Sequence, residues 1–217
     1  MKCFVIAMQG EAKPVLDWLE NLKVIEKDLY EGTLFNEKVA VIVCGVGKVN
    51  AACGAQLAID KYSPEVIINL GVAGGLNEKL EVGAVYCIDK AVQYDFDLAQ
   101  LNGTPKGTLN EYEQPYLSLS AGTSFPKMRL ATADRFNDDR ADFEFITKTL
   151  GADIRDMEGA AIAQVCLKRG VKCVAYKIIS DIAGRGSTTE QFTENLKLCY
   201  KSMGANLKQI MQDLENI

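Results

Sequence analysis

Two apolar runs, residues 66–70 and 171–179, constrain the fold of this chain more than any other feature of its sequence. Residues 66–70 are almost continuously apolar, without the alternation of a half-exposed strand, and residues 171–179 are apolar and rich in β-branched residues apart from Lys172 and Lys177. The first run is typical of a strand that is buried on both faces, as in a sheet that helices cover from both sides, and the second is predicted to be the last central strand. The sequence therefore predicts an α/β fold.

Strand and helix patterns alternate along the rest of the chain. Further strands are predicted over residues 2–7, 24–34, 39–44, 85–88 and 128–133, and helices over 11–22, 48–62, 142–150, 160–169 and 189–215. Residues 94–113 show little periodicity and are predicted to form a surface loop. The 217 residues contain no composition break or repeat, so we expect a single domain over residues 1–217, with a mixed β-sheet flanked by helices on both faces.

The charge and the cysteines indicate which partners and which compartment to expect. The net charge is -5 and no block of like charge occurs, which argues against nucleic acid or an anionic membrane as a partner. The seven cysteines form no C-x-x-C pair and are expected to be reduced core residues. The first apolar run, about six residues, is too short for a signal peptide or a membrane span, so we expect a cytoplasmic protein.

Acidic side chains stand where predicted buried elements give way to turns. Glu11 follows the first strand, Asp181 follows the run 171–179, and Asp156 and Glu158 precede a predicted helix. Because the chain contains no histidine, proton transfer would fall to carboxylates, Lys, Tyr, Cys or bound water. Each acid alone could cap a helix or lie in a solvated turn, and Asp156 fits that description best. Several acids at one sheet edge favour catalysis.

Two glycine-rich segments, residues 45–48 and 71–75, also follow predicted strands. Glycine lets the backbone approach a ligand closely, although ordinary turn chemistry is an alternative explanation for each segment. Gly47-Lys48 lacks the upstream glycine and the Ser or Thr of a P-loop, and residues 71–75 do not match G-x-G-x-x-G. ATP and NAD are therefore not supported as ligands, and a small neutral or cationic ligand fits better.

The order and spacing of these segments resemble those of the 5′-methylthioadenosine/S-adenosylhomocysteine nucleosidases, a family of the nucleoside phosphorylase superfamily. The resemblance covers residues 1–90 and 127–185 and is loose elsewhere. The matching segments are Ala7-Met8-x-x-Glu11, Gly45-x-Gly47-Lys48-Val49-Asn50-Ala51-Ala52, Asn69-x-Gly71-x-Ala73-Gly74-Gly75, Asp156-Met157-Glu158-Gly159-Ala160-Ala161 and Ile179-Ser180-Asp181.

This resemblance implies a nucleoside phosphorylase-like fold, a homodimer, and hydrolysis of the adenine–ribose bond in methionine salvage without a metal or other cofactor. Glu11 would activate water and Asp181 would protonate adenine at nitrogen 7, as the base and the acid of an inverting glycosidase do. Apolar surroundings would raise the pKa of Asp181. The residues expected to bind the adenine nucleoside are Met157, Glu158, Phe136, Asn137, Ser180, Val72, Ala73, Gly74, Val46 and Lys177.

The resemblance also implies roles within this set. Glu158 would hold the ribose hydroxyls with Met157 beside the sugar, Phe136 would stack on the base, and the backbone of Asn137 would bind the edge of the base. Ser180 would hold the second oxygen of the catalytic aspartate.

Three places depart from the family. Val72 stands where many members carry a hydroxyl, and Lys177 stands where they carry an arginine. Residues 187–189 are polar where the family places apolar groups against the 5′ arm, so we expect only a modest preference for 5′-methylthioadenosine over adenosine. The 5′ substituent stays open, with adenosine and aminodeoxyfutalosine as further candidates. Whether the loop 94–113 closes on substrate from its own or a partner chain stays open too.

Two other functions fit the same resemblance. A nucleoside phosphorylase needs a cationic phosphate site beside the sugar, and no arginine falls at the ends of the first or fourth predicted strands, where Glu11 would repel phosphate. A catalytically silent nucleoside-binding protein would need neither an acid nor a base, so the retention of Glu11, Glu158 and Asp181 argues against it. Hydrolysis is the favoured function.

Overall fold

The computed structural model describes residues 1–217 apart from the side chain of Asn216, and it confirms the α/β fold with a mixed sheet between helices. The strands are β1 (Lys2–Ile6), β2 (Glu20–Glu26), β3 (Leu29–Leu34), β4 (Glu37–Val43), β5 (Val66–Gly75), β6 (Val85–Gln93), β7 (Leu117–Ser118), β8 (Lys127–Thr132), β9 (Ile154–Asp156) and β10 (Lys172–Ile182). The helices are α1 (Gln9–Leu16), α2 (Lys48–Tyr62), α3 (Ala99–Asn102), α4 (Arg140–Glu144), the π-helical η1 (Phe145–Leu150), α5 (Gly159–Arg169), α6 (Thr188–Asp213) and the 3₁₀-helical η2 (Leu214–Asn216).

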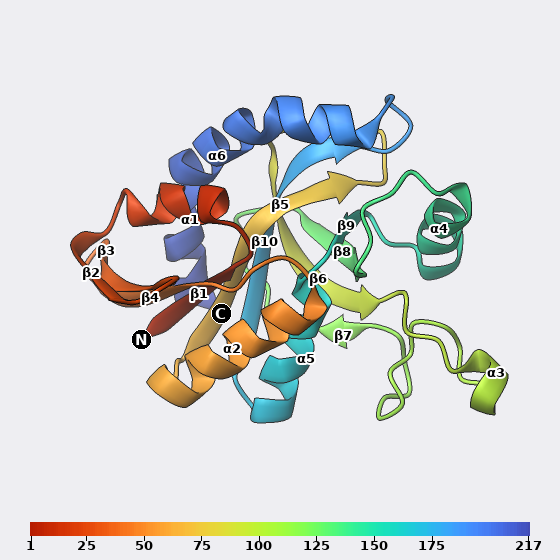
Figure 1. The fold of residues 1–217 in the computed structure, drawn as a ribbon, viewed down its shortest axis with the longest axis horizontal. Helices are drawn as coiled ribbons and strands as arrows, with labels where there is room; N and C mark the ends of the chain where they lie inside the picture. Colours follow the sequence, from red (N-terminus) through yellow and green to blue (C-terminus); the bar gives the residue numbers. More distant parts are fainter.

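Part of the sheet closes on itself. The strands follow the order β10-β6-β8-β9-β5-β1-β4-β3-β2, and β7 pairs with β6. A further pairing joins β10 to β5, so β5, β10, β6, β8 and β9 form a ring, from which β1, β4, β3 and β2 extend as an open sheet. β5 and β10 lie side by side at the centre of the molecule (Figure 1).

The strand β5 changes its partner halfway along. Its first residues pair in parallel with β1 as far as Asn69, whereas Gly74 and Gly75 pair with β9. Between Asn69 and Gly74, neither β1 nor β9 pairs with β5 along this edge. Backbone N–H and C=O groups of β5 are therefore free to bond side chains, as the N–H of Val72 does. This opening lies at the carboxyl ends of the parallel strands, where ligands bind in open α/β sheets.

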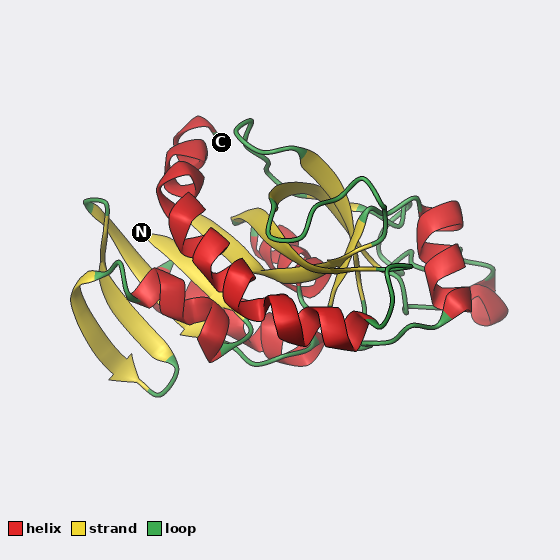
Figure 2. Cartoon of the chain, turned by 90° about the horizontal axis from the view of Figure 1, so that it is seen from above, coloured by secondary structure: helices red, strands yellow, loops and turns green.

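Helices cover both faces of the sheet, as β1 illustrates. Cys3 and Val5 pack in the cluster that includes α2 and α5, whereas Phe4 and Ile6 pack in the cluster that includes α1 and α6. Because successive side chains of a strand point to opposite faces, a strand buried on both sides must be apolar throughout. Figure 1 shows the two helix layers, and Figure 2 shows the long helix α6 crossing over the strands.

The helix predicted over residues 11–22 was wrong at its end. α1 ends at Leu16, and residues 20–26 form the edge strand β2, whose backbone pairs with β3. Pro14, inside α1, lacks an N–H for the helix ladder. Leu22 is 46% exposed, so the spacing that suggested a helix does not mark a buried face there. Strand pairing outweighs the weak helical preference of this segment.

The two central strands are longer than the sequence predicted. Residues 71–75, expected to form a glycine turn, continue β5, whose ten residues are all buried. β10 pairs with β5 as far as Ile182 and therefore contains Ser180 and Asp181. The strand predicted over residues 24–34 is interrupted by a turn at Asp28, which has a positive φ of 64°. The short strands β7 and β9 were not predicted.

The helices bear on whether the chain crosses a membrane, and the cysteines bear on whether it forms disulfide bonds. In the described part of the chain, no helix combines the length and the apolar character needed to cross a membrane. All seven cysteines are free, and five of them are buried as predicted, whereas Cys44 is half-buried and Cys53 is exposed.

Candidate active site

A cleft of about 490 Å³, including the part open to solvent, lies where β5 changes its partner. Its lining comes from the carboxyl ends of β5, β9 and β10, the start of α1, and the segments around Val46, Phe136 and Phe192. All predicted site residues line it except Asn137 and Lys177. The lining residues are Ala7, Met8, Glu11, Val46, Val72, Ala73, Gly74, Phe136, Arg155, Asp156, Met157, Glu158, Ser180, Asp181 and Phe192.

Glu11 lies in the first turn of α1 and is 2% exposed. The N–H of Val72 donates to its Oε1 over 2.7 Å, and the N–H of Met8 donates to its Oε2 over 3.0 Å. Burial raises the pKa of Glu11 above its ordinary value, against the lowering effect of these N–H groups and of Lys177. A carboxylate with a raised pKa, fixed through both oxygens, is a suitable general base.

A glycine makes room for Glu11. A Cβ at Gly71 would lie 2.9 Å from Oε1 of Glu11, closer than real Cβ contacts. Gly71 is therefore required by the close approach of the Glu11 side chain. The backbone at this position is an ordinary strand and does not form a turn.

Asp181 is placed by a β-bulge in β10. Ile179 lies opposite Ala73 and Asp181 lies opposite Gly74, so Ser180 is the extra residue. The hydroxyl of Ser180 donates to Oδ1 of Asp181 over 2.7 Å, whereas Oδ2 is buried and has no hydrogen-bond partner. Burial raises the pKa of Asp181 above its ordinary value. A buried carboxyl with one free oxygen in a cleft is well suited to donate a proton.

Glu11 and Asp181 approach β5 at two points. Oε1 of Glu11 lies beside Gly71 and Val72, and Oδ2 of Asp181 lies beside Gly74. Two to three residues of a strand span about 7–10 Å. This separation leaves room for a sugar ring and a water molecule between a base and an acid.

Lys177 lies behind the cleft and is 1% exposed. Its Nζ is 2.8 Å from Oδ2 of Asp156, whose side chain is also 1% exposed. Burial alone would lower the pKa of Lys177, but the charges of Asp156 and Glu158 raise it above its ordinary value. With Glu11, three carboxylates thus surround one ammonium, and the group carries more negative than positive charge when all are ionised.

Glu158 links this charged group to the loop before α2. Its Oε1 accepts the N–H of Gly47 over 2.8 Å. Gly47 has φ 99° and ψ 161°, a conformation that essentially only glycine adopts. Burial, followed by the charge of Asp156, raises the pKa of Glu158 to about 7. Glu158 therefore titrates near neutral pH.

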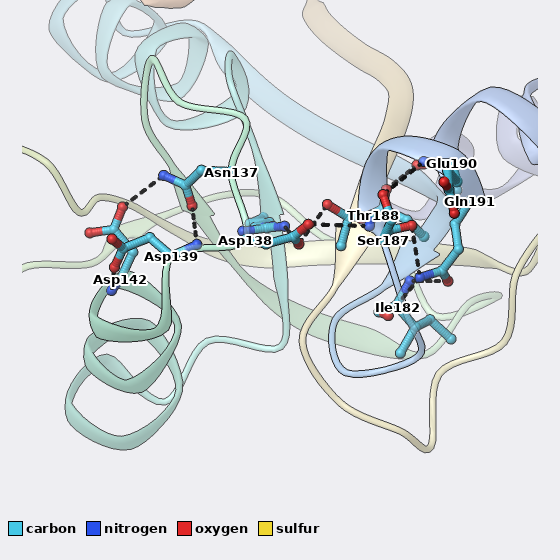
Figure 3. Close-up of polar contacts among 12 residues, drawn as sticks. Asn137, Asp138, Asp139, Asp142, Ile182, Ser187, Thr188, Glu190 and Gln191 are labelled. Atoms are coloured by element: carbon cyan, nitrogen blue, oxygen red, sulfur yellow. Dashed lines mark hydrogen bonds and ion pairs between the residues drawn. The ribbon is translucent and has the colours of Figure 1, made fainter.

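Asn137 does not line the cleft, and its side chain bonds elsewhere. Its amide donates to Oδ2 of Asp142 over 3.1 Å and its Oδ1 accepts the N–H of Asp139 over 3.2 Å. Figure 3 shows these contacts on the side of the loop next to α4. The role expected for the backbone of Asn137 stays a prediction.

The polar 5′ wall expected from residues 187–189 is not present in the cleft. Ser187 accepts the N–H of Glu190 as the N-cap of α6, and the hydroxyl of Thr188 donates to Oδ1 of Asp138 over 2.7 Å (Figure 3). Capping and this contact direct both side chains away from the cleft. Phe192, one turn further along α6, lines the cleft instead and packs edge-to-face against Phe136, with ring centroids 5.5 Å apart.

Arg155 is the functional candidate that the sequence analysis missed. It lies on the three-residue strand β9, opposite Gly74, and its side chain is 11% exposed. A strand so short has no periodicity to detect, and an arginine between apolar and acidic neighbours gives no motif of its own. Asp156 makes the structural contacts expected of it, since it accepts the N–H of Gly159 and pairs with the buried Lys177, and it also lines the cleft.

Comparisons with known proteins show which proteins this chain is similar to. The sequence model of the phosphorylase superfamily matches residues 2–213. A 5′-methylthioadenosine/S-adenosylhomocysteine nucleosidase of Anoxybacillus flavithermus is 35% identical over 78% of this chain and 79% of its own length. Another, of a Marinomonas species, is 29% identical over 95% of this chain and 96% of its own length. A solved structure of a putative 5′-methylthioadenosine/S-adenosylhomocysteine nucleosidase from Borrelia burgdorferi, bound to adenine, superimposes with a TM-score of 0.88 at 26% identity, covering 98% of this chain and 99% of that one.

The chain therefore belongs to the phosphorylase superfamily and, within it, to the family of 5′-methylthioadenosine/S-adenosylhomocysteine nucleosidases.

Proposed function

We propose that this protein is an N-glycosyl hydrolase that cleaves 5′-methylthioadenosine and S-adenosylhomocysteine to adenine and the corresponding thioribose. The observation that carries this proposal is the placement of Glu11 and Asp181 in one cleft, at two separate points along β5. The relatives named above are nucleosidases for these two compounds, and the cleft has the acid and the base that such a hydrolysis needs.

At the base end of the cleft, Asp181 is the proton donor. Departure of adenine leaves negative charge on the purine, and protonation at nitrogen 7 neutralises that charge. The free Oδ2 of Asp181 is the oxygen that would carry the proton, since Oδ1 is occupied by the hydroxyl of Ser180. Burial favours the protonated form, in agreement with this role.

At the sugar end, Glu11 orients a water molecule for attack at the anomeric carbon and accepts its proton. The transition state of such a reaction carries positive charge on the sugar. The excess of carboxylates over ammonium groups among Glu11, Asp156, Glu158 and Lys177 favours that charge electrostatically. Lys177 acts from behind the cleft, by holding Asp156 in place.

The remaining lining residues are proposed to bind the nucleoside. Glu158 holds the ribose hydroxyls with Met157 beside the sugar, and Phe136 stacks on the base. The backbone of Asn137, next to Phe136 in the chain but outside the lining of the cleft, is proposed to meet the edge of the base. Phe136 is 47% exposed, which leaves its ring free for such a contact. The residues that complete the walls are Val46, Val72, Ala73 and Gly74.

A phosphorylase reaction is not favoured by the charges of the cleft. One arginine, Arg155, does line it, but it comes from β9 and does not follow the first or the fourth predicted strand, where no arginine was expected. It lies opposite Gly74, at the end that holds Asp181, whereas the opposite end holds Glu11 and Glu158. Phosphate would have to approach the sugar past these carboxylates, which repel it.

The direct experiment is to incubate the protein with 5′-methylthioadenosine and to follow adenine release with and without phosphate. Hydrolysis predicts equal rates and free methylthioribose as the second product. A rate that requires phosphate, with a sugar 1-phosphate as the product, would identify a phosphorylase. Binding of the nucleoside without turnover would identify a silent binding protein.

We further propose that the chain acts as a single domain, in the cytoplasm, as a homodimer in methionine salvage. The free cysteines fit a reducing compartment. Val49 on α2 is an exposed apolar side chain at 74%, and a second copy that packs against this helix would cover it. Light scattering of the protein and of a Val49→Asp variant would test the dimer, because the charge should shift the mass towards that of the monomer.

A further inference from the structure

The guanidinium of Arg155 lies beside Asp181 without pairing with it. Both residues flank Gly74, Arg155 on β9 and Asp181 on β10. The position of a Cβ on Gly74 would be 2.8 Å from Oδ2 of Asp181 and 3.3 Å from Nε of Arg155. Because Gly74 has no side chain, the carboxyl of Asp181 and the guanidinium of Arg155 can both occupy this end of the cleft.

The partner of Arg155 is Asp138, at a long distance. Nη2 of Arg155 is 3.9 Å from Oδ1 of Asp138, and the same Nη2 is buried without a hydrogen bond. Asp138 itself is held by the hydroxyl of Thr188, as Figure 3 shows. The carboxylate therefore attracts the guanidinium from one side and leaves its N–H groups available to another acceptor. A buried donor without an acceptor is costly, so a ligand that supplies one is favoured.

Arg155 also separates the cleft from a second hollow. It lines the cleft together with Asp181, and it lines a neighbouring cavity with Asp138, Phe143 and Ser187. A base that reaches Asp181 would consequently present its neighbouring edge to the guanidinium. The guanidinium of Arg155 therefore bounds this end of the cleft and offers hydrogen-bond donors. A site that takes only adenine would instead need a hydrogen-bond acceptor here, for the 6-amino group of the base.

The chemistry of purines decides which base satisfies both groups. A protonated Asp181 needs an acceptor, which nitrogen 7 of any purine offers. Arg155 needs an acceptor next to it, which the oxygen of a 6-oxopurine offers and the 6-amino group of adenine does not. Arginine binds the adjacent oxygen 6 and nitrogen 7 of guanine in this way in the major groove of DNA.

We propose that Arg155 is a specificity-determining residue that enables the base site to take 6-oxopurine nucleosides, such as 5′-methylthioinosine, in addition to adenine nucleosides. The proposal rests on the proposed hydrolase function and adds a substrate class to it. Arg155 acts by donating to oxygen 6 of the base, while Asp181 protonates nitrogen 7 as it does for adenine.

The test compares kcat/KM for 5′-methylthioinosine and 5′-methylthioadenosine in the parent and in Arg155→Met, whose stem keeps the packing. We expect the parent to hydrolyse both, and the inosine-to-adenosine ratio to fall by at least about tenfold in the variant. Arg140→Met is the matched control, because its guanidinium is 89% exposed and pairs with Glu144, so the ratio should stay within threefold.

Binding of the free bases, measured by calorimetry, separates this proposal from the proposed function. Hypoxanthine should bind to the parent and lose affinity in Arg155→Met more than adenine does. The proposal is overturned if the parent hydrolyses only the adenosine compound, if the variant affects both nucleosides equally, or if hypoxanthine does not bind. If neither nucleoside is hydrolysed, the hydrolase function fails, and hypoxanthine binding still decides the role of Arg155. Arg155→Lys, which keeps the charge, provides a second variant if the first does not fold.

Discussion

The ammonium of Lys177 lies 2.8 Å from Oδ2 of Asp156, and each side chain is 1% exposed. Charges this deeply buried are stable only while both partners are present, because either one alone has lost its hydration. The pair also lies against Glu158, so it influences the electrostatics of the cleft as well as the stability of the fold. Its removal should therefore be far more costly than removal of a surface ion pair.

The variant Lys177→Met should lower the free energy of unfolding by about 3–5 kcal/mol, since it leaves Asp156 buried and unpaired. Lys61→Met is the control: Lys61 pairs with Glu26 at 2.8 Å, but the two side chains are 35% and 56% exposed. That loss should be at most about 1 kcal/mol. Urea unfolding measures both, and similar small losses would contradict the account of the buried pair.

Glu158 should make stability depend on pH between about 4.5 and 7. Its pKa is about 7 in the folded protein, against an ordinary value of 4.5. The folded state therefore binds more protons in this window, and its stability decreases as pH rises through it, by up to about 3 kcal/mol.

Glu158→Gln removes this titration while its amide oxygen can still accept the N–H of Gly47. The difference in unfolding free energy between the variant and the parent should shift in favour of the variant from pH 5 to pH 8. Comparing the two proteins at each pH cancels the titration of the acids that do not interact with Glu158. A difference that is the same at both pH values would contradict the raised pKa.

Glu11→Gln should lose turnover of 5′-methylthioadenosine but still bind adenine. Glu11 lies beside Gly71 and Val72, whereas the base is expected at the end of the cleft where Asp181 lies beside Gly74. Loss of a general base should lower kcat by about a hundredfold or more. Adenine affinity, measured by calorimetry, should stay within a few-fold. Loss of adenine binding as well would mean that Glu11 organises the whole cleft.

Much of the fold and of the cleft could be predicted, because buried central strands leave long apolar runs in the sequence and the acids beside them stand out. The runs 66–70 and 171–179 identified β5 and β10, and the acids at the ends of predicted elements led to Glu11, Glu158 and Asp181. The order and spacing of the motifs indicated the family.

The rest depended on contacts between distant segments. Whether residues 20–26 continue a helix or pair with β3 is decided by the sheet, and the direction of the Thr188 side chain is decided by Asp138, 50 positions away. Arg155 enters the cleft only because β9 pairs with Gly74. Such pairings leave no local pattern in the sequence.

The cleft is lined by Phe192 and by none of the polar residues 187–189, which changes the expected preference for the 5′ group. Since Phe192 lines the cleft, Phe192→Ala should lower kcat/KM for 5′-methylthioadenosine more than for adenosine, by about tenfold if roughly two methylene-sized contacts are lost. Thr189→Ala, an exposed side chain on the same helix, should leave the preference unchanged. Equal losses of kcat/KM for both substrates would mean that Phe192 acts on the base, by supporting the ring of Phe136, and does not contact the 5′ group.

The central claim is that Asp181 protonates the leaving base, and the most direct test is the kcat of Asp181→Asn with 5′-methylthioadenosine. An amide cannot donate the required proton, yet it keeps the size of the side chain and can accept the hydroxyl of Ser180, so the thermal unfolding profile should stay close to that of the parent. We predict that kcat falls by about a hundredfold or more. A folded Asp181→Asn protein that turns over within a few-fold of the parent would contradict the claim.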